Sequence, residues 1–262
     1  MNRTHRIRLL WAVTAASLLL PWLLPRIPQD PAYHAFADRV AALGIANFWN
    51  VVSNLPFLVV GIAGLRALPG APGKLPELDL HYRIFFLGVA LTGLGSAYYH
   101  LAPDNGTLVW DRLPMTPAFM AFFTVVIGEH LDTGLANRLL MPLLALGVAS
   151  VGYWHWSESV GLGDLRPYGL VQFLPMLMIP LILLLFPSRF DSVRPLWALI
   201  GCYALAKLLE QFDRPILELT GVIGGHPLKH LAAAAGAGCL VAALKRRRQR
   251  RRIAGGGIRW DR

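Results

Sequence analysis

Eight stretches of this sequence are apolar over lengths that approach the thickness of a lipid bilayer. A helix needs roughly 20 apolar residues to cross a hydrocarbon core of about 30 Å, and several of the stretches reach this length only with their flanking residues. Because only helices and closed barrels satisfy their backbone polar groups in lipid, we expect an all-α integral membrane protein with eight helices. The stretches are Leu9–Leu24, Phe48–Leu68, Ile84–Tyr99, Leu113–Ile127, Leu139–Trp154, Leu170–Phe186, Leu196–Leu209 and Leu228–Leu244.

The charge of the chain supports this class of protein. Only 15% of the residues are charged, against about 25% in soluble domains. Much of the net charge of +10 comes from the basic block Lys245–Arg252, directly after the last apolar stretch. Such a block is typical of a cytoplasmic membrane flank, and no basic face with interleaved aromatic residues accompanies it, so we do not expect nucleic-acid binding. We expect the segment after Lys245 to be disordered.

The apolar pattern divides the chain into three parts. Residues 1–46 contain the first helix and an outer loop, residues 47–244 contain the other seven helices, and residues 245–262 form a basic cytoplasmic tail. The first stretch follows Arg3, Arg6 and Arg8, as in a signal peptide, but no small-residue cleavage site lies close behind it. We therefore expect this helix to be retained.

Basic residues predict the orientation of the helices in the membrane. If the N-terminus is inside and the chain crosses eight times, most loop arginines and lysines and the basic tail fall on the inside. The positive-inside rule therefore places both termini in the cytoplasm. The preference for arginine over lysine and the short loops favour a bacterial inner membrane.

This orientation brings four polar motifs, far apart in the sequence, to the outer face of the membrane. They are Asn47–Asn54, Gly95–His100, Trp110–Met115 and Gly225–His230. Polar groups at membrane depth are costly, so their convergence indicates a functional site.

Two histidines of the last motif are spaced for metal binding. His226 and His230 are four residues apart, which places both imidazoles on one side of a helix. Pro227 suits the first turn of that helix. Taken alone, the pair is equally consistent with polar packing.

Three further residues complete a set with a clear chemistry. Ser96 and His100 are also spaced i, i+4, and Asp111 follows after a short loop. Asp111 alone could simply favour the helix N-terminus, with Arg112 neutralising it. Together, three histidines match catalytic zinc with one open ligand position, a carboxylate can move a proton, and a hydroxyl can support an oxyanion. This inventory suits metal-assisted hydrolysis of an acyl bond.

At these residues the chain resembles the alkaline ceramidases, whose wider membrane hydrolase superfamily includes adiponectin receptors and lipid-remodelling factors for GPI anchors. The similarity runs from about Asn47 to Gly236 and depends on the motifs FWNVVSN, GLGSAYYH, WDRLPM and HPLKH. It implies a seven-helix bundle, with Leu9–Leu24 as an additional helix. It also implies a zinc-dependent hydrolase that cleaves the amide of ceramide or a related lipid. The implied zinc ligands are His100, His226 and His230; Asp111 would activate water and Ser96 would hold the reacting oxygen.

The chain departs from that family at three places. Eukaryotic members bind calcium through an acidic cluster at the first family helix, where this chain has Asn47 and, before it, only Asp30 and Asp38. We therefore expect no calcium site. Lys229 lies where the family usually has tryptophan, and Arg112 replaces an acidic residue. The resemblance therefore does not determine the chemistry of the substrate head group.

Two other functions remain possible from the sequence. The same zinc could hydrolyse esters of phospholipids or glycolipids, or the chain could be a seven-helix receptor in which Asp111 or His155 supplies a fourth, structural ligand. His155 is more simply associated with the interfacial tryptophans beside it.

The roles of other polar residues are also open. Asn50, Ser53 and Asn54 either orient the metal ligands or join helices. Lys207 and Glu210 are expected to pair with each other. The segment Leu174–Phe186 is a lipid-facing or core helix, or the wall of an acyl-chain tunnel.

Overall fold

The computed structural model describes residues 2–252 and 258–260, most of them in helices. Each of the eight predicted apolar stretches lies largely within a helix. The helices are α1 (Arg3–Leu19), α2 (Phe48–Val52), α3 (Leu55–Ala67), α4 (Asp79–Leu101), α5 (Asn105–His130), α6 (Thr133–Ser159), α7 (Arg166–Leu185), α8 (Arg194–Gln211), α9 (Asp213–Thr220) and α10 (Gly225–Arg246), with 3-10 turns η1 (Leu20–Leu23), η2 (Pro31–His34) and η3 (Pro76–Leu78).

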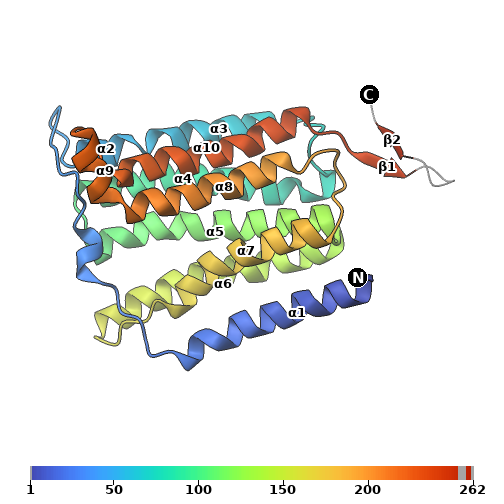
Figure 1. The fold of residues 1–262 in the computed structure, drawn as a ribbon, viewed down its shortest axis with the longest axis horizontal. Helices are drawn as coiled ribbons and strands as arrows, with labels where there is room; N and C mark the ends of the chain where they lie inside the picture. Colours follow the sequence, from blue (N-terminus) through green and yellow to red (C-terminus); the bar gives the residue numbers. More distant parts are fainter. Residues whose placement is uncertain (1, 253–257, 261–262) are drawn as a thin grey trace.

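Six helical segments of the described chain are long and apolar enough to cross a membrane. They are Arg3–Leu23, Phe48–Ala67, Pro76–Leu101, Thr133–Ser159, Arg166–Leu185 and Gly225–Arg246. The second span joins α2 and α3 across Ser53 and Asn54. The protein is therefore a multi-pass membrane protein of helical class. Helices α5 and α8 run beside these spans (Figure 1) and carry charged residues, so the count of seven or eight crossings stays a prediction.

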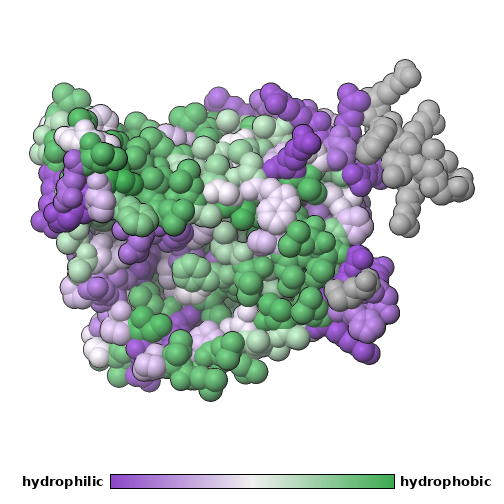
Figure 2. Space-filling view, in the orientation of Figure 1, coloured by the Kyte–Doolittle hydropathy of each residue, from purple (hydrophilic) through white to green (hydrophobic). Residues whose placement is uncertain are grey.

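The helices form an elongated bundle with its loops at two ends (Figure 1). Helix α1 lies at the edge of the bundle and contacts α7. The start of α1 and the end of α10 lie at the same end, while η2, α2 and α9 lie at the other. Figure 2 shows hydrophobic residues over much of this face of the bundle and hydrophilic residues gathered toward its two ends. This distribution is the one expected when lipid surrounds the middle.

Glycines allow two helix pairs to approach each other closely. A Cβ at Gly95 of α4 would lie 2.0 Å from the Trp110 carbonyl oxygen of α5. A Cβ at Gly225 of α10 would lie 2.1 Å from the Leu209 carbonyl oxygen of α8. Small residues are the usual means of close helix packing in membranes. Both contacts lie at the end of the bundle where the polar motifs gather.

A buried ion pair holds the opposite end of the bundle. Arg247 is 2% exposed and donates to both carboxylate oxygens of Glu129 at 2.8 Å, and Tyr82 donates to the same carboxylate. Arg247 also donates to the Gly73 carbonyl oxygen at 2.9 Å. The C-terminal segment is thereby attached to α4 and α5.

The expectation of disorder directly after Lys245 was therefore wrong. Lys245 and Arg246 complete α10, and Arg247 is buried because Glu129 offers it a carboxylate. Beyond it, β1 (Arg250–Arg252) pairs antiparallel with β2 (Ile258–Trp260). The residues from 253 to 257, and residues 261 and 262, lie outside the described structure.

We predict that Glu129→Gln destabilises the bundle strongly. The substitution keeps the side-chain size but leaves the Arg247 guanidinium buried without its counter-charge, and breaking a buried pair costs about 3–5 kcal/mol. The thermal unfolding midpoint of detergent-purified protein should fall markedly. Asp79→Asn is the control, because the partly exposed Asp79 carboxylate pairs with Lys74 and Arg83, and each such surface pair should contribute about 1 kcal/mol or less. Equal midpoints for both variants would contradict the assignment.

Candidate active site

Three buried histidines converge at the end of the bundle that carries α9. One ring nitrogen from each of His100, His226 and His230 lies within 4.8 Å of the others. The ring centroids are separated by 4.9 Å for His100 and His226 and by 5.0 Å for the other two pairs. His100 is in the last turn of α4, and the other two are in the first turns of α10. The i, i+4 spacing puts His226 and His230 on one side of α10, and the packing of α4 brings the third predicted ligand, His100, to them.

The hydrogen bonding of these rings fits a bound metal ion. His100 Nδ1 and His226 Nε2 are buried and have no hydrogen-bond partner. The Nδ1 atom of His230 is bonded to Ser53 Oγ at 2.8 Å, so its Nε2 atom is left for a metal. A buried polar atom without a partner costs free energy, and a transition metal would satisfy such nitrogens. Three protein ligands leave a fourth position open for water or substrate.

Polar side chains hold the histidines in place. Besides Ser53, Asn47 donates from Nδ2 to the His100 carbonyl oxygen at 2.9 Å. Asp213 accepts the His226 backbone N–H at 2.8 Å and the Ala37 backbone N–H at 2.9 Å. Asp213 thus connects the start of α10 to the loop after η2.

The structure gives different contacts to Asn50, Ser53 and Asn54, whose roles the sequence left open. Only Ser53 contacts a histidine of the cluster. Asn50 donates to the Asp38 carbonyl oxygen at 2.8 Å and so holds the loop after η2, whereas Asn54 donates to the Asn50 carbonyl oxygen within its own helical segment.

Phe36 covers the histidine cluster, a contact that no sequence pattern predicted. Its buried ring lies 4.6 Å from the His100 ring and 4.4 Å from the His226 ring. The residue belongs to the loop that precedes the seven-helix region. Its apolar ring shields one side of the cluster from water.

Asp111 and Ser96, the predicted proton carrier and the predicted hydroxyl donor, line the same cavity. His230 lines this cavity with them, and the Ser96 hydroxyl is near enough to the Asp111 carboxylate to form a hydrogen bond with it. The close contact between Gly95 and Trp110 brings their helices together. Asp111 is not a member of the close histidine group, which among the described residues contains no carboxylate.

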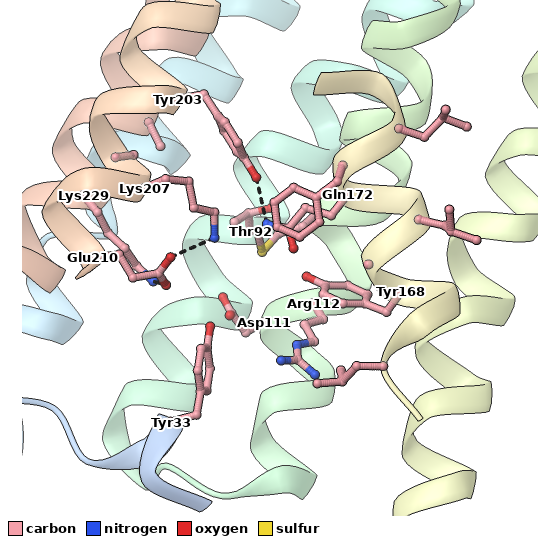
Figure 3. A pocket seen from close by; sticks show the side chains of 18 of the residues that line it. Tyr33, Thr92, Asp111, Arg112, Tyr168, Gln172, Tyr203, Lys207, Glu210 and Lys229 are labelled. Atoms are coloured by element: carbon pink, nitrogen blue, oxygen red, sulfur yellow. Dashed lines mark hydrogen bonds and ion pairs between the residues drawn. The ribbon is translucent and has the colours of Figure 1, made fainter. Parts of the chain in front are cut away.

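The cavity measures about 660 Å³ and has a polar and an apolar part. Figure 3 shows Asp111 between Tyr33 and Lys207 in the polar part. The apolar part lies between α1 and α7, with η1 and the loop after it. Its lining includes Pro21, Leu24, Ile27, Leu170, Phe173, Leu174 and Leu177. The additional N-terminal helix therefore contributes directly to the cavity, which the sequence did not predict.

Two lysines share one carboxylate in the polar part. Lys207 donates to Glu210 at 2.7 Å, which confirms the expected pair. Lys229 of α10 also bonds to Glu210, although the two residues are far apart in the sequence. Lys229 lies between His226 and His230 in sequence and joins α10 to α8 through this contact.

Arg112 lies in an aromatic cage instead of pairing with Asp111. Its guanidinium carbon is 4.2 Å from the Trp154 ring centroid, 4.6 Å from that of Tyr168 and 5.6 Å from that of Tyr33. Burial, followed by the charge of Glu210, raises the pKa of Tyr33 to about 12, so its hydroxyl stays protonated. This cage was not predicted, because its members come from four separate segments.

His155 does not join the histidine cluster. It is exposed, and its ring centroid lies 6.2 Å from that of Trp154. His34 lies nearer to the site and bonds to Tyr99 at 2.9 Å and to Asn105 at 3.0 Å. Neither residue is placed to complete the ligand set.

Comparison with known proteins gives one family. The family model described as Ceramidase matches residues 38–186, which include Ser96, His100 and Asp111. Alkaline ceramidase 3 of Mus musculus is 31% identical over 78 residues, 30% of this chain and 27% of that protein. The protein dcd3A of Dictyostelium discoideum, which bears a provisional alkaline ceramidase name, is 29% identical over 119 residues, 38% of this chain and 41% of that protein.

The chain spans less than half the length of each of these two curated relatives. The match to the family model ends at residue 186, before α10. The family model nevertheless spans more than half of the chain. This multi-pass membrane protein therefore belongs to the alkaline ceramidase family.

Proposed function

We propose that this protein is a zinc-dependent membrane hydrolase that cleaves the amide bond of ceramide or a related N-acyl lipid and releases a fatty acid. The observation that carries the proposal is the histidine cluster beside a cavity that Asp111 and Ser96 also line. The names of the family and of the curated relatives point to the same substrate class.

His100, His226 and His230 would hold the zinc ion. An all-nitrogen set of three imidazoles with an open position is typical of catalytic zinc. When bound, zinc lowers the pKa of water and polarises a carbonyl group. Ser53 fixes the ring of His230 through its other nitrogen, so the ligand is already oriented before the metal binds.

Asp111 and Ser96 supply the remaining chemistry. The Asp111 carboxylate accepts a proton from the attacking water and passes it to the amide nitrogen as the carbon–nitrogen bond breaks. The water oxygen becomes part of the fatty acid, and the nitrogen leaves as an amine. Ser96 donates a hydrogen bond to the carbonyl oxygen as its negative charge develops.

The apolar part of the cavity suits the acyl chain. Leu170, Leu174 and Leu177 line it from α7, and Pro21 and Leu24 from the N-terminal segment. Leu174 and Leu177 belong to the segment Leu174–Phe186, and they would form part of the wall of an acyl-chain tunnel. A bilayer lipid could then place its amide beside Asp111 with its chain among these residues.

We further propose eight crossings, with both termini in the cytoplasm and the site on the outer side, in a bacterial inner membrane. The start of α1 and the end of α10 lie at one end of the bundle, and the histidines lie at the other (Figure 1). The basic residues near the termini favour the inner side for that end. We place the domain boundaries at residues 46 and 244.

Ester hydrolysis of a phospholipid or glycolipid would use the same groups, and a panel of amide and ester lipids separates the two activities. A receptor with a structural metal requires a fourth protein ligand. Neither Asp111 nor His155 belongs to the close histidine group.

We predict about one zinc ion per chain in the purified protein and its loss in His230→Ala, because two histidines alone bind zinc weakly. Elemental analysis of detergent-purified protein checks this. His155→Ala should keep its zinc, since His155 lies outside the cluster. Folded wild-type protein without any metal would remove the basis of the proposal.

We predict that Asp111→Asn lowers the hydrolysis rate by roughly 10²- to 10⁴-fold, the usual contribution of a positioned acid or base, and leaves zinc bound. Ser96→Ala should lower it by roughly 10²- to 10³-fold. Single-turnover hydrolysis and elemental analysis of the same preparations provide the test. If Asp111→Asn lost its metal, Asp111 would be a ligand and its assigned role would be wrong.

A further inference from the structure

We propose that Arg112 binds an anionic group on the head of the lipid, so that the substrates of this protein are N-acyl lipids whose head group carries a carboxylate, phosphate or sulfonate. This inference rests on the proposed hydrolase function and narrows its substrate class. It makes Arg112 a residue that determines specificity.

The first observation is that Arg112 is a buried cation, 5% exposed, that forms no ion pair with any residue of the described structure. Its Nη2 atom donates to Gln29 Oε1 at 2.7 Å, while its Nη1 atom is buried without a partner. An ionisable residue at membrane depth normally serves function, and an unpaired buried charge is costly.

The second observation is the position of Arg112 on the cavity wall. Arg112 follows Asp111 in α5, and both residues line the same cavity (Figure 3). Gln29 and the rings of Tyr33, Trp154 and Tyr168 fix the guanidinium from several sides. An arginine held in this way loses little conformational entropy when a carboxylate or phosphate approaches it from the cavity. A head group there would lie beside the amide at Asp111.

The third observation is the charge of the cavity lining. Arg166 also lines the cavity, but Asp164 neutralises it at 2.8 Å. The lining then retains three cations, Arg112, Lys207 and Lys229, against the carboxylates of Asp111 and Glu210. Both lysines bind the Glu210 carboxylate, whereas no carboxylate among the described residues pairs with Arg112, and its Nη1 atom has no hydrogen-bond partner. A divalent metal would make the cavity more positive still.

The test compares hydrolysis of N-dodecanoyl lipids with an uncharged, a carboxylate and a phosphate head: a ceramide, an N-acylglycine and a ceramide 1-phosphate. We expect wild-type protein to prefer the anionic lipids by roughly 10- to 100-fold in kcat/KM, as a charge-assisted hydrogen bond would give. Arg112→Gln should lose that preference, so that its kcat/KM values on the charged and uncharged lipids become similar. The carboxylate and phosphate arms identify which anion is preferred.

Arg166→Gln is the matched control, because this cavity arginine already has a carboxylate partner and should leave the preference unchanged. Equal wild-type rates on charged and uncharged heads would overturn the inference, even if Arg112→Gln failed to fold. A second measurement is inhibition of wild-type protein and Arg112→Gln by the product, dodecanoic acid. If Arg112→Gln were less inhibited but kept the head-group preference, Arg112 would bind the product carboxylate and the inference would be wrong.

A binding measurement separates this inference from the proposed function. Chelator-treated protein in nanodiscs should bind a fluorescent N-acyl lipid with a phosphate head more tightly than its uncharged counterpart, and Arg112→Gln should remove the difference. Hydrolysis of ceramide without anion preference would defeat only the inference. Anion-selective binding by a protein that hydrolyses no lipid of the panel would defeat only the proposed function.

Discussion

Two close helix contacts determine where the polar groups of this protein can meet. Gly95 brings α4 against α5, and Gly225 brings α10 against α8. The first contact brings together Ser96 of α4 and Asp111 of α5, which line one cavity, and the second brings Lys229 of α10 to Glu210 of α8. In a bilayer there is no water to satisfy a misplaced polar side chain. The close contacts and the polar chemistry therefore depend on each other, since a wider helix spacing would leave the same groups without partners.

The N-terminal segment adds a second level of organisation. Phe36 covers two of the histidines, Asp213 accepts the Ala37 amide, and Gln29 holds Arg112. The segment that precedes the seven-helix region is thus part of the candidate active site, and α1 completes the cavity from the side. The histidine cluster, the cage around Arg112 and the cavity each include a contribution from residues 17–40, although the sequence alone indicated only a helix and a loop there.

The sequence predicted those parts of the site that depend on local geometry. An i, i+4 spacing in a helix fixes the relation of His226 to His230. A short loop places Asp111 at the same end of the bundle as His100, so these residues could be found by pattern. Phe36, the cage around Arg112 and the contact of Lys229 with Glu210 join segments that are distant in the sequence, and no period or spacing reports them. The expectation that the segment after Lys245 is disordered was wrong for the same reason, because Arg247 pairs with Glu129 on a distant helix.

The distribution of the three histidines also has a consequence for how the protein is made. His100 enters the membrane with α4, whereas His226 and His230 arrive with α10, after α5 to α8. During synthesis the nascent chain therefore carries one imidazole at the future site while most of the bundle assembles. An ion held by all three histidines, as proposed above, could not template the early helices and could be captured only once the final helix has been inserted. The proposed metal site would therefore be completed late in the maturation of the protein.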